Sequence, residues 1–138
     1  MKIEISGDYG DPKADDIFWP LQRALNDLFE PLLKNRYFNS IREFSIVFRV
    51  SGRALDFKSE GPELLKYNKK SQYITIDLTF PESAWKGIEM DDIKMNVVNG
   101  LNLSFDLMIE KAIEVDNSRD LDALISDFKS VMSDFIKK

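Results

Sequence analysis

The strictest pattern in the chain is YITIDLTF at Tyr73–Phe80, in which apolar and polar side chains alternate without interruption. Because neighbouring side chains of a β-strand point to opposite faces, one face of this segment is apolar and the other is polar. KIEIS at residues 2–6 alternates in the same way, and FSIVFRV at residues 44–50 does so apart from Val47. Residues 53–58 are expected to return as a hairpin partner after Gly52. These segments predict a sheet with one buried and one solvent-facing side.

Apolar residues at helical spacing follow the first predicted strand, over residues 17–33. Asp11 and Pro12 are typical of a helix start, because Asp accepts hydrogen bonds from free amides and Pro suits the first helical position. Pro20 and Pro31 would interrupt such a helix, since an interior proline removes a backbone hydrogen bond. We therefore expect a helix that starts late or is broken, and that is best formed between these two prolines.

The last third of the chain predicts two long helices. After the last strand, a short helical turn is expected through PESAW, with Trp85 as a large apolar anchor. The first long helix is expected to begin near Asp91 and Asp92, because carboxylates in a first turn are stabilised by the positive end of the helix dipole. Asn117 or Ser118 should begin the second, and apolar residues line one face of each helix.

Strands grouped in the middle of a chain with helices at its ends are typical of an α+β fold rather than of a repeating parallel βαβ array. We predict a single domain over residues 1–138, since a chain of this length buries about two-thirds of its surface around one core. The predicted architecture has two layers: an antiparallel sheet of about four strands, with helices packed on one face. Two of these are the long C-terminal helices.

The residue inventory argues against catalysis. The chain has no histidine and no cysteine, which excludes a Ser-His-Asp arrangement, a thiolate nucleophile and the usual transition-metal ligands. A carboxylate pair or a lysine Schiff base remains open, yet nearly all Asp and Glu residues fall at predicted helix ends or on polar faces, where ordinary pKa values are expected. We therefore predict a binding protein that is not an enzyme and that holds no cofactor.

The sequence also predicts a cytoplasmic location. No apolar run approaches the roughly 20 residues that cross a bilayer, so no membrane association is expected. The opening MKIEISGDYG lacks the apolar centre of a signal peptide.

The charge distribution favours a basic partner. The net charge is −5, and the ends of the chain are acidic while residues 31–58 carry an excess of Lys and Arg. An acidic surface disfavours direct binding to nucleic acid, whose affinity for proteins comes mostly from Lys and Arg that neutralise phosphates. By the same electrostatics, an acidic surface favours binding to basic proteins. The alternative is that the charge only keeps the protein soluble and binds no partner.

The stretch SGDYGDPKADD at residues 6–16 places two glycines and four aspartates between a strand and a helix. Gly7 and Gly10 stand where many proteins hold a phosphate, but their spacing matches neither a dinucleotide-binding motif nor a P-loop, and the carboxylates would repel phosphate. The aspartates could ligate Ca²⁺ or Mg²⁺, yet their spacing matches no EF-hand loop, so no metal site is assigned. Two interpretations remain: a turn that caps the helix, or an exposed acidic hook for a basic partner.

The hook interpretation defines a candidate binding site. Its aromatic anchors are Tyr9 and Trp19, since aromatic side chains often dominate interface energies. The candidate partner-binding residues are Asp8, Tyr9, Asp11, Asp15, Asp16, Trp19, Glu89, Asp91 and Asp92. The exposed sheet face around Arg49, Thr75 and Asp77, and the basic middle of the chain, are alternative contact surfaces.

Four residues in the middle of the first long C-terminal helix are poor helix formers: Asn96, Asn99, Gly100 and Asn102. One interpretation is a polar contact row with Asp106. The favoured interpretation is that Gly100 lets a neighbouring element approach closely while the asparagines face water.

The segments YITIDLTFPESAW and VVNGLNLSFDLMIEKA, separated by an acidic helix start, resemble the small α+β immunity proteins that bacteria encode beside contact-dependent or other polymorphic toxins. The resemblance covers most of the chain in its size, acidity and element order. It implies a cytoplasmic protein that neutralises a cognate toxin domain, often a basic nuclease, by covering its active or substrate-binding surface. This function needs a complementary surface and no chemistry of its own.

A small acidic secretion chaperone is the alternative function. Such chaperones are similar in length and isoelectric point, but they hold an extended effector segment and usually dimerise through a helix. An obligate dimer would favour the chaperone, whereas the immunity interpretation predicts a monomer or a weak homodimer.

Overall fold

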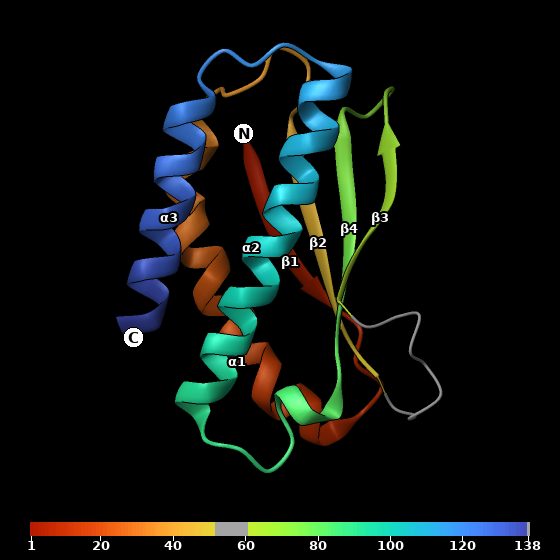
Figure 1. The fold of residues 1–138 in the computed structure, drawn as a ribbon, viewed down its shortest axis with the longest axis vertical. Coiled ribbons are helices and arrows are strands. Elements are labelled where there is room, and N and C mark those ends of the chain that lie inside the picture. The colour runs from red at the N-terminus through yellow and green to blue at the C-terminus, as the bar shows by residue number, and fades with distance from the viewer. Residues whose placement is uncertain (52–60, 138) are drawn as a thin grey trace.

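The computed structural model describes residues 1–51 and 61–137, which form a four-stranded sheet and three long helices (Figure 1). The elements along the chain are β1 (Lys2–Gly7), α1 (Pro12–Phe29), the 3₁₀ helix η1 (Glu30–Lys34), β2 (Glu43–Val50), β3 (Gly61–Asn68), β4 (Tyr73–Phe80), the 3₁₀ helix η3 (Glu82–Ala84), α2 (Met90–Val115) and α3 (Leu121–Lys137). The predicted α+β class is therefore confirmed. The expected hairpin partner at residues 53–58 lies outside the described residues.

The sheet is mixed, so the prediction of an antiparallel sheet was wrong. Its strand order is β1-β2-β4-β3, in which β2 runs parallel to both β1 and β4, and only β3 and β4 pair antiparallel. The physical reason is the path of the chain. The α1–η1 crossover returns the chain to the starting end of β1, so that β2 begins beside the first residues of β1 and runs in the same direction.

The strand β3 was not predicted, because GPELLKYN begins with Gly and Pro and does not alternate. Its pairing with β4 shifts register between Leu64 and Lys66, which breaks the period-two pattern. Since β3 reverses the chain before β4, overlooking it also hides the parallel pairing of β2 with β4.

Three helices cover one face of the sheet, and their shared core reaches from β1 to the last turn of α3 (Figure 1). The core takes the alternating residues that the strand patterns predict, such as Ile5, Ile46 and Ile76. α1 lies on β1 and α2 on β3 and β4, while α3 packs against both of these helices. The backbone of Ile5 at the outer edge of β1 is also paired, because the side-chain amide of Asn26 donates to its carbonyl and accepts from its N–H, both at 2.8 Å.

α1 is continuous from Pro12, so the expected late start or break was wrong. Asp11 caps it as predicted, with its carboxylate accepting from the backbone N–H of Lys13 at 2.9 Å and of Ala14 at 3.4 Å. Pro20 lies inside the helix on an exposed face, where the loss of one backbone bond is offset by the burial of neighbours such as Phe18. Pro31 falls in η1, at the end of α1.

The C-terminal helices lie close to their predicted places. α2 begins at Met90, one residue before the predicted acidic start, and Trp85 is buried next to the predicted turn η3. α3 begins at Leu121 rather than at residue 117 or 118. The intervening residues instead fasten the end of α2 to the segment before β2: the backbone N–H of Arg119 donates to the Tyr37 carbonyl at 2.7 Å. The Tyr37 hydroxyl in turn donates to the Asp127 carboxylate.

Gly100 marks the close approach of α2 to β4, as the favoured interpretation predicted. A Cβ atom at this position would lie 3.0 and 3.1 Å from the two terminal methyl groups of Leu78 and 3.3 Å from the Phe80 ring. Asn99 and Asn102 are exposed, as expected. Asn96 does not simply face water, because it is half-buried and its amide donates to the Ala84 carbonyl at 3.0 Å, so the interpretation was wrong for this residue.

We expect Gly100→Val to lower the free energy of unfolding by about 1–3 kcal/mol, because overpacking against buried β4 outweighs the gain in helix propensity. Asn99→Val introduces the same side chain at the exposed neighbouring position and should change stability by less than about 0.5 kcal/mol. Urea denaturation of both variants measures the difference. Equal stabilities would show that the close approach does not require glycine.

No helix in the described part of the chain is both long and apolar enough to span a membrane.

Candidate functional site

Two acidic segments that are far apart in the sequence meet at one end of the molecule (Figure 1). Because β1, β2 and β4 are parallel, the turn after β1 and the turn after β4 leave the sheet at the same edge. The first segment, Asp8–Asp16, and the second, Glu82–Asp92, each contain four carboxylates and one lysine. We call these two segments together the acidic edge.

A cluster of aromatic rings holds both segments of the acidic edge in place. The Phe18 ring of α1 lies at its centre, 5.2 Å from the Tyr9 ring of the first segment and 6.2 Å from the Trp85 ring of the second. Phe18 also stacks on Phe80, at the end of β4, with 5.1 Å between ring centroids. The two turns are thus fixed to one another through a buried side chain.

The Tyr9 ring is buried beneath the first segment and is not exposed to a partner. Only 8% of its surface is exposed. Its hydroxyl donates to the side-chain oxygen of Gln22 at 3.0 Å, and burial, helped by the charge of Asp15, raises the pKa of the Tyr9 phenol above its usual range. The backbone around it is therefore well fixed.

The glycines of this loop have structural roles. A Cβ atom at Gly7 would lie 2.5 Å from atoms of the Tyr9 and Gln22 side chains, so the absence of a side chain makes room for the tyrosine. Gly10 has φ +62°, a left-handed conformation that glycine adopts without strain. Because Tyr9 occupies the space beside Gly7, this turn does not form an open phosphate cradle.

The remaining predicted residues of the first segment lie at or near the surface. Asp11 is partly used as the cap of α1, and Asp8 lies 3.2 Å from the guanidinium of Arg49 on β2. Asp15 is half-buried and Asp16 exposed in the first turns of α1. Trp19 is 45% exposed, and its ring meets the Tyr9 ring edge-on at 6.3 Å, so it presents an apolar surface beside the carboxylates.

The second segment presents Glu89, Asp91 and Asp92 at the start of α2, and all three are exposed. No side chain caps this helix start, so the unpaired amides there leave a partial positive charge that stabilises the carboxylates. The structure thus brings these residues to the same end as the first segment. Among residues 1–51 and 61–137, no group of three acidic side chains is arranged to hold a metal ion.

The uncovered face of the sheet, the alternative contact surface, is occupied by ion pairs. Arg49 bridges Asp8 and Asp77, with its Nε 3.0 Å from the Asp77 carboxylate. Farther along the sheet, Lys2 lies 2.9 Å from Glu4 and 3.6 Å from Glu43. Among the described residues, the charges of this face around Arg49 and Lys2 are therefore matched, whereas most carboxylates of the acidic edge have no ion-pair partner within 4.0 Å.

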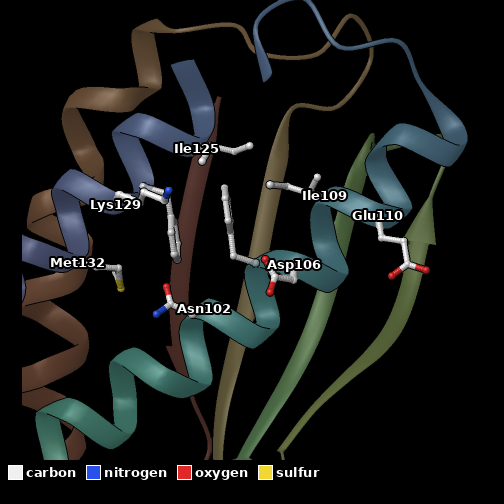
Figure 2. A pocket seen from close by; sticks show the side chains of 9 residues that line it. Asn102, Asp106, Ile109, Glu110, Ile125, Lys129 and Met132 are labelled. Carbon is white, nitrogen blue, oxygen red and sulfur yellow. The ribbon is translucent and has the colours of Figure 1, made fainter. Parts of the chain in front are cut away.

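A groove of about 600 Å³ between α2 and α3 was not predicted from the sequence. The rings of Phe105 and Phe128 line it, stacked with 3.8 Å between centroids, and Ile109, Ile125 and Met132 add further apolar surface. Figure 2 shows side chains of both helices on its two sides. The sequence signal is that α2 has apolar residues around much of its circumference, including Ile109, which lines the groove.

Charged side chains stand around this apolar groove. Asp106 and Glu110 lie on the α2 side and Lys129 on the α3 side (Figure 2). In the part of the chain that the structure describes, none of these three has an ion-pair partner within 4.0 Å.

Comparison with known proteins places the chain in a family. The sequence model of Immunity protein 44 matches residues 1–134, nearly the whole chain. No curated protein and no solved structure matches it significantly. Immunity proteins of this kind bind and neutralise toxins and are not enzymes, so the match confirms the predicted resemblance and the predicted absence of catalysis, and it favours immunity over a secretion chaperone. The chain therefore belongs to the Immunity protein 44 family.

Proposed function

We propose that this protein neutralises its cognate toxin by docking the acidic edge against a basic surface of the toxin and covering the active or substrate-binding site there. The observation that carries the proposal is the convergence of two acidic segments, fixed to each other through Phe18, at one end of the molecule. A preformed surface with a large excess of one charge attracts a partner of the opposite charge and loses little conformational entropy on binding.

The charge of the acidic edge also suggests the class of toxin. Enzymes that act on nucleic acid bind its phosphates with Lys and Arg, so a basic nuclease domain would offer the complementary cleft. Exposed carboxylates such as Asp16 and Asp92 would occupy the positions of substrate phosphates, and Trp19 would add an apolar contact. We place this encounter in the cytoplasm of a bacterium that carries a polymorphic or contact-dependent toxin system, with the immunity protein acting as a monomer or weak homodimer.

The test is co-expression with the protein encoded directly upstream of this chain. We expect expression of the upstream toxin alone to stop growth, and co-expression of this protein to restore it and to yield a stable complex on copurification. Asp122→Asn, an exposed change in the first turn of α3 that lies outside both the acidic edge and the groove, should rescue growth equally well. A toxin that stays lethal in the presence of folded immunity protein would contradict the proposal for that pair.

A further inference from the structure

We propose that the groove between α2 and α3 is a second toxin-binding site, which takes an apolar segment of the toxin that carries Lys or Arg beside its apolar residues. The inference rests on the proposed immunity function, because it takes the toxin as the occupant. It differs from that proposal in the surface, the chemistry and the kinetic step involved.

The groove has the composition of a binding site. Its volume of about 600 Å³ falls within the range of about 300–1,000 Å³ that is typical of ligand pockets. The stacked rings of Phe105 and Phe128 line it, and the half-buried Ile109 and Ile125 present further apolar surface from opposite helices. Such a surface gains free energy when a partner covers it, because apolar area leaves water.

The charges around the groove select the partner. Two carboxylates on α2, Asp106 and Glu110, face solvent without an ion pair in the described structure, against a single lysine, Lys129, on α3. The rim therefore has an excess of negative charge on its α2 side. A toxin segment with Lys or Arg over α2 would pair with these carboxylates while its apolar side chains enter the groove.

The same charge count disfavours a second copy of this chain as the occupant. Two grooves facing each other would bring four rim carboxylates together with two lysines, since each groove carries two carboxylates and one lysine. Each copy also has a net charge of −5, so the copies repel one another at long range, whereas a basic toxin is attracted.

The polar row on α2 connects this groove with the acidic edge. Asp92, Asn99, Asp106 and Glu110 are spaced seven, seven and four residues apart, and at 3.6 residues per turn this spacing keeps them on one outward side of the helix. All four are exposed. A partner docked on the acidic edge can therefore extend along α2 and reach the groove over this row of exposed polar side chains.

The test measures toxin binding by two groove variants, using the toxin domain identified in the rescue experiment. Asp106→Lys with Glu110→Lys reverses the rim, and Asn102→Trp places a bulky side chain at an exposed position on the groove wall. We expect each to raise the Kd at least about tenfold, mainly through faster dissociation, because the groove anchors the bound state. Asp27→Lys with Glu30→Lys makes the same charge change at exposed positions of α1 and η1 that do not line the groove, and should bind as the unaltered protein does.

Thermal unfolding of each variant is measured alongside, so that a loss of folding is not read as a loss of contact. Unchanged toxin dissociation in both groove variants, with native unfolding temperatures, would overturn the inference. A dimer of the free protein that these variants break, seen by sedimentation, would also overturn it, because the groove would then bind a second copy. If neutralising the acidic edge weakens toxin binding and the groove variants do not, the proposed function stands and the groove inference fails. If only the groove variants weaken toxin binding, the groove inference stands and docking through the acidic edge fails.

Discussion

Phe18→Ala is expected to lower the free energy of unfolding by about 3–5 kcal/mol, the largest single-residue effect that we anticipate in this protein. Phe18 is fully buried, and its ring lies within 6.3 Å of the rings of Tyr9, Phe48, Phe80 and Trp85. Alanine would leave a cavity among side chains of α1, β2, β4 and both turns of the acidic edge, and they cannot all move to fill it. For a chain of this length the midpoint of thermal unfolding should fall by roughly 10–20 °C.

The adjacent tryptophan provides the matched control. Trp19 follows Phe18 directly but points outward, so Trp19→Ala removes a large aromatic side chain without opening a buried cavity. We expect its unfolding midpoint to lie within about 3 °C of the unaltered protein. Calorimetry of the two variants would separate the roles of the two residues. An equal fall of the unfolding midpoint in both would show that Phe18 is not the packing centre of this end of the fold.

The sequence predicts those parts of the fold whose local signals agree with their tertiary environment. The alternation at β4, the Asp11 cap and the buried Trp85 all carry such signals, and the structure contains each of them. By contrast, β3 has Gly61 and Pro62 at its start and an irregular register in its middle, so its strand character comes from pairing with β4 rather than from its own residues.

The sequence allowed the residues of the candidate site to be predicted, but not their position in the fold. Seven aspartates and glutamates could be identified as exposed at helix starts, but their meeting at one end depends on the parallel direction of β1 and β4, which the sequence does not reveal. Tyr9 shows the same limit: an aromatic residue in a polar loop suggests a contact, yet a glycine two residues earlier allows it to fold inward onto Phe18. The groove was missed because it depends on how far α2 and α3 stand apart.

Neutralising three carboxylates of the acidic edge should slow association with the toxin about ten- to hundredfold at low ionic strength. The variant carries Asp16→Asn, Asp91→Asn and Asp92→Asn, at exposed positions drawn from both segments. Asp11 and Asp8 are left unchanged, because one caps α1 and the other pairs with Arg49. Electrostatic attraction acts mainly before contact, so the association rate should fall more than the dissociation rate rises.

The salt dependence makes this prediction specific. Screening shortens the reach of charges to about 10 Å at 0.1 M salt, so the difference between the variant and the unaltered protein should shrink as salt is added. A control with Glu30→Gln, Glu114→Gln and Asp122→Asn removes the same net charge from exposed positions outside the acidic edge. Stopped-flow or surface-binding kinetics would compare the three proteins. If both variants slowed association equally, net charge rather than the acidic edge would attract the toxin, and the docking surface would have to lie elsewhere.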